Sequence, residues 1–318
     1  MEQRNLGTGG CAVGVLGLGT STWGSGTSSE EAHEQARMLV ESGGNLVDIH
    51  LDGSAARGAA SSYVRDGIVG AGLRREVLVC VRTPARSSRR EMLTALEDAV
   101  EATGVGHADM WIIDGWSPHV AWDEVVASLA VATASGRAFY AGLRPDDSWQ
   151  AGLVGAGLYM QPERPPLAAL LAPGSLLDLE TWRPVSDVAD ALGCAMIAAS
   201  PLAGGVLTGK YRHATPPDSR GAGERHAGRL QHYRDPWAWP VVEALCAAAE
   251  GLGVSPGALA LAWARDRAGV ATVLTGARTV HQWRAALDSA RVTMPSEIRH
   301  VLDEVAANAT RMGEDGLD

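Results

Sequence analysis

Lysine is almost missing from this 318-residue chain. Lys210 is the single lysine, and the other 26 of the 27 basic side chains are arginine. Acidic side chains outnumber basic ones by 37 to 27, which gives a net charge of −10. Neither a phosphate backbone nor an anionic lipid surface attracts a chain of this charge. We therefore expect no nucleic acid and no membrane among its partners, and a small-molecule substrate instead.

Cysteine is also scarce, and long apolar runs are absent. The four cysteines, Cys11, Cys80, Cys194 and Cys246, lie far apart and lack the close spacing of a zinc site, so we expect no metal and four reduced thiols. No apolar run reaches the roughly 20 residues of a membrane helix. The N-terminus lacks the basic-then-apolar pattern of a signal peptide. These absences favour a cytoplasmic protein, either monomeric or oligomeric.

Several common catalytic and nucleotide-binding motifs are missing as well. Gly17-Leu-Gly19 is followed by Thr20, Ser21 and Thr22, so the third glycine of a dinucleotide fingerprint is absent. The chain has no HExxH, no Walker lysine loop and no GxSxG. A doubly wound dinucleotide-binding fold is therefore not favoured.

What the chain does contain is a regular alternation of short apolar runs and helical stretches. This alternation predicts repeated βα units and a parallel sheet, and eight strands close a barrel. We expect a single (β/α)8 barrel domain over residues 1–318. The expected strands are Val15–Leu18, Asn45–Asp48, Val77–Val81, Met110–Asp114, Phe139–Leu143, Leu167–Leu171, Ala195–Ala199 and Thr272–Leu274.

Two stretches depart from this rhythm. Residues 212–239 contain Pro216-Pro217 and several Gly and His, with little apolar periodicity. A long irregular stretch of this kind predicts a loop over the barrel mouth. Near the C-terminus we expect a helix over Pro295–Ala307, followed by a polar tail over residues 308–318.

A glycine-rich turn follows the seventh expected strand. It reads Ser200-Pro-Leu-Ala-Gly-Gly-Val-Leu-Thr-Gly-Lys210 and contains the single lysine. Glycine lets backbone N–H groups approach an anion closely, so this turn is a candidate phosphate cradle. The alternative is a tight loop in which the lysine has no role.

A second candidate anion site follows the eighth expected strand. Thr275-Gly-Ala-Arg278 leads into a helix that contains Gln282. Both the planar guanidinium of an arginine and the N-terminal end of a helix favour a phosphate. In a barrel, both turns would lie at the carboxyl ends of the strands, where barrel enzymes place their sites.

Together these stretches resemble the aldo-keto reductase superfamily over nearly the whole chain. Further matching motifs are Leu16-Gly-Leu-Gly-Thr20, Trp23-Gly24, Asn45-Leu-Val-Asp48 and Ala260-Leu-Ala-Trp263. The resemblance implies a barrel that binds the phosphate end of NADP(H) and no other cofactor. The residues implied to bind it are Ser200, Leu202, Gly204, Gly205, Lys210, Gly276, Arg278, Thr279 and Gln282.

The resemblance fails at the residues that carry out the family's reaction. Family members use an aspartate, a tyrosine, a lysine and a histidine, and only the aspartate matches, as Asp48. The tyrosine would fall near Gly53, where none is present, and the segment from Ile49 to Ser62 is about three residues longer than usual. Arg82 stands in the lysine position and Asp114 in the histidine position. Arginine keeps the charge but does not shuttle protons at neutral pH.

The nicotinamide end is altered too. The family's Ser-Asn pair is Arg144-Pro145, and the aromatic residue before Ser-Pro-Leu is Ala199. The glutamine of the sixth strand is replaced by Ala169 or Leu170. We therefore expect the site to retain the residues that bind the phosphate end of the cofactor but not those that bind the nicotinamide.

These departures favour an enzyme that acts on a carbonyl-bearing small molecule by acid–base chemistry, such as cyclisation, dehydration or isomerisation, in bacterial specialised metabolism. Its expected catalytic residues are Asp48, His50, Arg82 and Asp114, with Trp23, Trp116 and Arg144 in the substrate pocket. One alternative is an NADPH-dependent oxidoreductase with a substituted proton donor such as His50. Another is a non-catalytic regulatory or partner subunit. For Arg82 and Asp114 the competing interpretation is a structural ion pair, and for His50 a solvent-facing loop residue.

Overall fold

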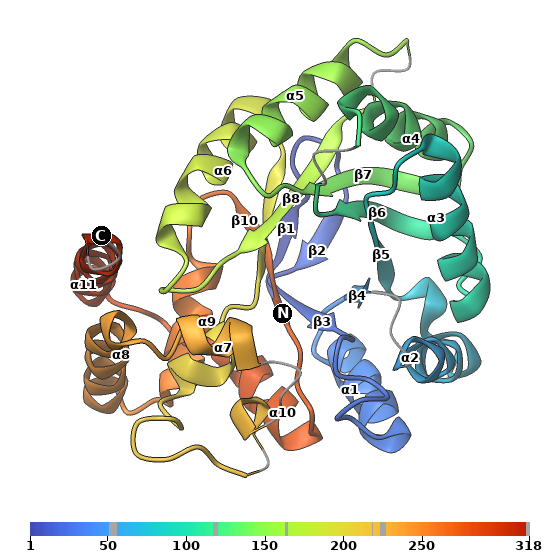
Figure 1. Ribbon diagram of the computed structural model, residues 1–318. Coiled ribbons are helices and arrows are strands. Elements are labelled where there is room, and N and C mark those ends of the chain that lie inside the picture. Colours follow the sequence, from blue (N-terminus) through green and yellow to red (C-terminus); the bar gives the residue numbers. More distant parts are fainter. Residues whose placement is uncertain (51–55, 117–119, 163–164, 218, 223–226, 316–318) are drawn as a thin grey trace.

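A closed barrel of eight parallel strands forms the centre of the molecule. The computed structural model describes residues 1–50, 56–116, 120–162, 165–217, 219–222 and 227–315. Figure 1 shows the helices as a ring around the strands. The strands run around the barrel in chain order, and β10 closes it by pairing with both β9 and β3. Their bounds are β3 Leu16–Gly19, β4 Leu46–His50, β5 Leu78–Pro84, β6 Ala108–Asp114, β7 Ala138–Arg144, β8 Leu167–Pro173, β9 Ala195–Ala199 and β10 Val270–Thr275.

The predicted (β/α)8 barrel is therefore confirmed, and each expected strand is present with ends shifted by no more than three residues. The helices follow the strands in the expected alternation. Their bounds are α1 Ser29–Glu41, α2 Ala56–Val64, α3 Arg89–Thr103, α4 Trp122–Ala134, α5 Ser148–Tyr159, α6 Leu179–Leu192, α7 Ala227–His232, α8 Trp239–Leu252, α9 Pro256–Arg265, α10 Val280–Asp288 and α11 Ser296–Asp315.

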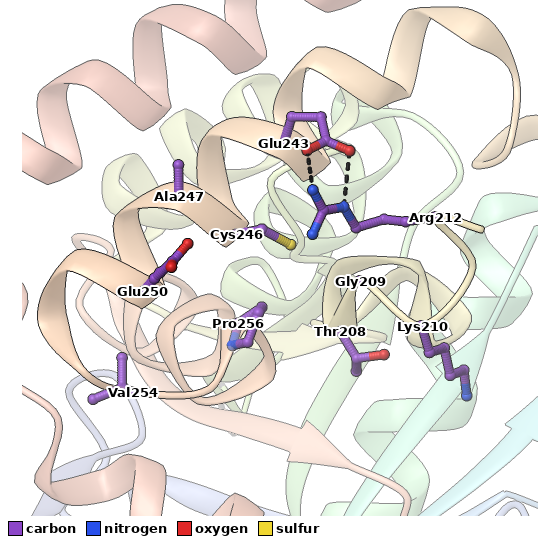
Figure 2. A pocket seen from close by; sticks show the side chains of 10 residues that line it. All are labelled: Thr208, Gly209, Lys210, Arg212, Glu243, Cys246, Ala247, Glu250, Val254 and Pro256. Atoms are coloured by element: carbon purple, nitrogen blue, oxygen red, sulfur yellow. Dashed lines mark hydrogen bonds and ion pairs between the residues drawn. The ribbon is translucent and has the colours of Figure 1, made fainter.

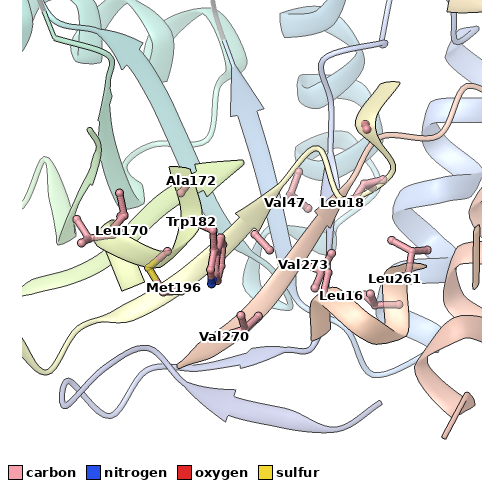
Figure 3. Close-up of a cluster of buried hydrophobic side chains, with 14 of the residues drawn as sticks. Leu16, Leu18, Val47, Leu170, Ala172, Trp182, Met196, Leu261, Val270 and Val273 are labelled. Atoms are coloured by element: carbon pink, nitrogen blue, oxygen red, sulfur yellow. The ribbon is translucent and has the colours of Figure 1, made fainter. Parts of the chain in front are cut away.

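The two faces of each strand pack into separate hydrophobic cores. Outward-facing side chains such as Leu16, Val47 and Met196 pack against the helices, and Figure 3 shows part of this outer core. Inward-facing side chains such as Cys80 and Ile197 fill the barrel interior. Successive side chains of a strand point to opposite faces, so this two-sided burial explains why the strands read as continuous apolar runs.

An N-terminal hairpin, which was not predicted from the sequence, closes the amino end of the barrel. Strands β1 Gln3–Asn5 and β2 Ala12–Gly14 pair antiparallel. Leu6 and Val13 of this hairpin pack with the first inward-facing residues of the strands. With that end covered, ligands must enter from the carboxyl end.

The two irregular stretches also have defined positions. Helix α11 continues to Asp315, so most of the expected polar tail is helical. The described part of segment 212–239 is not loop throughout, because it contains helix α7, and Leu230 of this helix lies against Gly204 of the turn that follows β9. Within the described residues no single helix has the length and hydrophobicity of a membrane span, although the bent pair Pro236–Leu252 and Pro256–Arg265 reaches both in combination.

Candidate active site

Charged side chains line the inner face of the barrel at the carboxyl ends of four adjacent strands. Asp48 and His50 are two residues apart on β4, so they share a face. Arg82 on β5 pairs in register with His50, and Asp114 on β6 pairs with Arg144 on β7. The strand register therefore brings together the four predicted catalytic residues and Arg144.

These side chains form one ionic cluster. Arg82 binds Asp48 through two hydrogen bonds, Nε to Oδ1 at 2.7 Å and Nη2 to Oδ2 at 2.9 Å. Its Nη1 donates to Asp114 Oδ2 at 2.8 Å, and Arg144 Nε donates to the other oxygen of Asp114. Arg144 also lies 3.2 Å from Asp146. A guanidinium held by two carboxylates is fixed in position as well as in charge.

Burial and charge together decide the protonation of this cluster. Burial by itself would lower the pKa of Arg82, but the Asp48 and Asp114 carboxylates outweigh it and hold that pKa above its ordinary value. Burial would raise the pKa of Asp114, but His50, Arg82 and Arg144 outweigh it and hold that pKa well below its usual range. At neutral pH Arg82 is therefore a fixed cation and Asp114 a fixed anion, and neither exchanges protons readily.

His50 differs from its neighbours. Its Nδ1 lies 3.1 Å from Asp114 Oδ2, which is ion-pair distance, yet the two groups are not aligned as a hydrogen bond. About a quarter of its side chain is exposed, 28%, compared with 3% for Asp48. Histidine is the side-chain type that ordinarily changes charge near neutral pH. Within the cluster, His50 is thus the residue suited to exchange a proton.

The glycine-rich turn after β9 forms a cradle. It folds as a 3-10 segment, Ala203–Thr208, in which Gly204 and Gly205 adopt φ values of 67° and 100°. A Cβ at Gly205 would lie 2.8 Å from Lys210 Nζ, so the lysine occupies space that only a glycine leaves open. The Gly205 N–H itself donates to the Leu202 carbonyl at 2.8 Å, so the group of this turn best placed for a phosphate is the Lys210 ammonium, which the missing side chains of the glycines leave accessible.

The second turn, after β10, is held by side chains from its own helix. Thr279 caps α10 and accepts from the Gln282 backbone N–H at 3.2 Å. The Gln282 side chain accepts from the Arg278 backbone N–H at 3.0 Å. The guanidinium of Arg278 takes no part in these bonds, and it carries the positive charge of this turn.

One cavity of about 840 Å³ joins the ionic cluster to both turns. Asp48, His50, Arg82, Asp114 and Arg144 line it at one end. The predicted anion-binding residues that line it are Ser200, Leu202, Gly204, Gly205, Lys210, Gly276, Arg278 and Gln282. Thr279 does not line it and acts as the helix cap instead. The position near Gly53, where the family's tyrosine would fall, lies outside the described residues.

Neither Trp23 nor Trp116 is among the described residues that line the cavity. Trp23 is 1% exposed, and its indole N–H donates to Gln35 of α1 at 3.2 Å. The ring therefore points into the barrel wall. Trp116 packs edge-on against Trp149, with ring centroids 6.1 Å apart. Its backbone N–H donates to Asp146.

Sequence reasoning missed two contributors to the cavity wall. Tyr233, from segment 212–239, lines the cavity and donates to Asp178 at 2.6 Å. Burial raises the pKa of Asp178 in spite of this bond. The first turn of α9 lines the cavity with Pro256 and Gly257, next to the capping Ser255. The Ser-Pro-Gly sequence does signal a helix start, but only the fold shows what that helix end faces.

A smaller pocket of about 410 Å³ lies on the other side of the same glycine turn. Figure 2 shows the Arg212–Glu243 ion pair at its edge, and Lys210 points away from that pair. Cys246 lies in its wall, close to Gly209. Within the described part of the chain, no three His, Cys, Asp or Glu side chains are grouped so as to hold a metal ion.

Comparison with known proteins agrees with the fold. The model of the Aldo/keto reductase family matches residues 15–307 of this chain. Protein tas of Escherichia coli strain K12 is 24% identical over 334 aligned positions, which cover 92% of this chain and 94% of that protein. Protein tas of Shigella flexneri matches with the same identity and coverage. The resemblance expected from the sequence is confirmed.

Proposed function

The chain belongs to the aldo/keto reductase family, and we propose that it is an enzyme that binds NADP(H) and acts on a carbonyl-bearing small molecule, with His50 as the proton-transferring group. The observation that carries the proposal is the single cavity. It is lined by two cation-bearing turns at one end and by His50 and the ionic cluster at the other. A cofactor bound by its phosphates would extend towards the strand ends.

The residues at the phosphate end fit such a cofactor. The Gly204-Gly205 cradle and Lys210 would hold the pyrophosphate, and Arg278 would bind the 2′-phosphate. Among the described residues, Lys210 and Arg278 form no ion pair with a carboxylate, so their charge is available to a ligand. NADP(H), when bound, supplies or accepts a hydride.

At the strand ends, the roles follow from the protonation of the cluster. Arg82 is held by two carboxylates, so it would hold Asp114 in position beside His50. The Asp114 carboxylate, which lies 3.1 Å from Nδ1 of His50, would stabilise the protonated imidazole. His50 would then exchange the proton with substrate through Nε2. This is general acid–base catalysis by a residue other than the family's tyrosine.

A second candidate function is proton-transfer chemistry without reduction, such as cyclisation, dehydration or isomerisation in bacterial specialised metabolism. The observation that favours it is the composition of the cavity between the two ends. Ala199 and Arg144 line the region where the family has an aromatic ring and a Ser-Asn pair. A nicotinamide ring would gain little from an alanine there, so its position would be poorly fixed.

The decisive experiment titrates NADPH while following its fluorescence, then incubates the complex with a panel of carbonyl compounds. Absorbance of NADPH and mass analysis of the products are followed together. Reduction predicts loss of NADPH in step with product, and slow turnover of simple aldehydes. Product formed with NADPH intact would favour the second candidate, and failure to bind NADPH would contradict the cofactor assignment.

His50→Gln tests the proton-transferring role. We expect turnover to fall by about 10²–10⁴-fold, because general acid–base catalysis commonly contributes that factor. NADPH affinity should be unchanged, since His50 lies at the opposite end of the cavity from the anion-binding turns. His300→Gln, at an exposed position on α11, is the matched control. Full activity in His50→Gln would exclude the role.

A further inference from the structure

We propose that helix α1 sets the preference for a 2′-phosphate through Gln35 and Glu31, two residues that do not line the cavity. The inference rests on the proposed NADP(H) binding at Arg278. Gln35 fixes the turn that carries Arg278, and Glu31 places a negative charge at the same turn. The two residues are four apart on α1 and lie on one face of it. Gln35 reaches Ala277, between β10 and α10, and Glu31 reaches Val280, the first residue of α10.

The carbonyl of Ala277 is the point at which the turn is held. It accepts from Gln35 Nε2 at 3.2 Å and from Thr22 Oγ1 at 3.1 Å, and Thr27 Oγ1 lies 3.3 Å away. All of these side chains are buried, and Gln35 has no exposed surface. Several buried donors directed at one carbonyl fix the orientation of the peptide that leads into Arg278.

Trp23 determines which end of the Gln35 amide faces the turn. Its indole N–H can only donate, and it lies 3.2 Å from Gln35 Oε1. The amide nitrogen of Gln35 must therefore point to Ala277. The buried position of Trp23, which excludes it from the substrate pocket, thus has a role in the anion-binding turn.

The same loop also supports the Arg278 side chain. A Cβ at Gly26 would lie 3.2 Å from Cδ of Arg278, so the arginine stem lies directly over this glycine. Thr22 and Thr27, on either side of Gly26, hold Ala277. The backbone that starts the turn and the stem of its arginine are therefore positioned by one loop.

Glu31 acts on the turn by charge. Its carboxylate accepts from the backbone N–H of Val280, the first residue of α10. A carboxylate at this position stabilises the helix, but it also opposes a second negative charge nearby. Gln35 and Glu31 should therefore shift 2′-phosphate discrimination in opposite directions.

The test compares the affinities of 2′-phospho-ADP-ribose and ADP-ribose by calorimetry, because their ratio reports the 2′-phosphate contact alone. In Gln35→Leu we expect the ratio to fall by about three- to tenfold, as one buried hydrogen bond to the turn is lost. Gln150→Leu is the matched control. Gln150 is a buried glutamine that caps α5, far along the chain from this turn. Its loss should lower stability and leave the ratio unchanged.

In Glu31→Gln we expect the ratio to rise by about two- to fivefold, since the amide keeps an acceptor for Val280 and removes the charge. Glu30→Gln is its control, because Glu30 lies in the same helical turn but binds Ser28. Glu31→Gln changes a partly exposed side chain, so this variant tests the inference even if Gln35→Leu does not fold.

The outcomes separate this inference from the function on which it rests. Suppose that the wild type binds both ligands but the affinity ratio is unchanged in Glu31→Gln or in folded Gln35→Leu. This result would overturn the inference and leave the proposed function standing. Equal shifts in a variant and its control would overturn it too. Wild-type protein that binds neither ligand would overturn the proposed cofactor site and the inference with it.

Discussion

The two ends of the cavity use positive charge in opposite ways. At the strand ends, Arg82 and Arg144 are bound by Asp48 and Asp114, so most of their charge is neutralised within the protein. At the other end, Lys210 and Arg278 form no ion pair with the described carboxylates. The contrast shows which charges hold the barrel mouth together and which can bind an anion.

Removal of Arg82 should have the largest effect. Arg82→Met leaves Asp48 and Asp114 without their shared partner, and we expect unfolding free energy to fall by about 3–5 kcal/mol. Urea denaturation measures it. Arg144→Met is the comparison, with a smaller loss, because Asp114 keeps Arg82. Affinity for 2′-phospho-ADP-ribose should stay unchanged in both, and a stable Arg82→Met variant would contradict the structural role of the cluster.

Gly205→Ala should instead damage the anion end. We expect a stability loss of about 1–3 kcal/mol from the strained backbone, and about tenfold weaker binding because Lys210 must move. Gly136→Ala is the control, since Gly136 also has a positive φ, 72°, with nothing near its Cβ position. Calorimetry should find normal binding in the control. Normal binding in Gly205→Ala would mean that the cradle is not used.

The pH dependence of stability should separate two buried carboxyl groups. The folded-state pKa of Asp114 is lowered, so its stabilisation is complete above the unfolded value of about 4 and is lost as pH falls through the folded pKa. The folded-state pKa of Asp178 is raised by burial, so its contribution is present below about 4 and is lost as pH rises.

Asp114→Asn and Asp178→Asn test this difference. The stability of Asp114→Asn should fall furthest below that of the wild type at neutral pH, and the two stabilities should approach each other in acid. Asp178→Asn should show the opposite trend. Thermal unfolding from pH 3 to pH 8 measures how the stability of each variant changes with pH. Parallel curves for the two variants would contradict the opposite pKa shifts of Asp114 and Asp178.

The smallest effect is expected on the outer side of the glycine turn. Glu243→Gln removes the partner of Arg212 in an exposed ion pair, and such pairs contribute little to stability. We expect no measurable change in unfolding or in ligand affinity. A clear loss of 2′-phospho-ADP-ribose binding would place the ligand in the smaller pocket rather than in the main cavity.

The sequence by itself determined the barrel and the residues at its carboxyl ends. Short apolar runs and their alternation with helical stretches are local features of the chain, so they can be read without tertiary contacts. The same argument located Asp48, His50, Arg82 and Asp114, because each stands at or near the end of a readable strand.

Only the tertiary structure decided how those residues are used. The sequence could not show that Arg82 joins two carboxylates, because that depends on the register of strands about thirty residues apart. The sequence predicted Trp23 in the pocket, because a tryptophan in a mouth loop can face either the cavity or the protein interior. In the structure, its indole N–H donates to Gln35 of α1, so the ring faces the interior. Tyr233 reached the cavity through the packing of segment 212–239, which has no periodicity to read. Side-chain direction in loops is set by long-range contacts, and these exist only once the chain has folded.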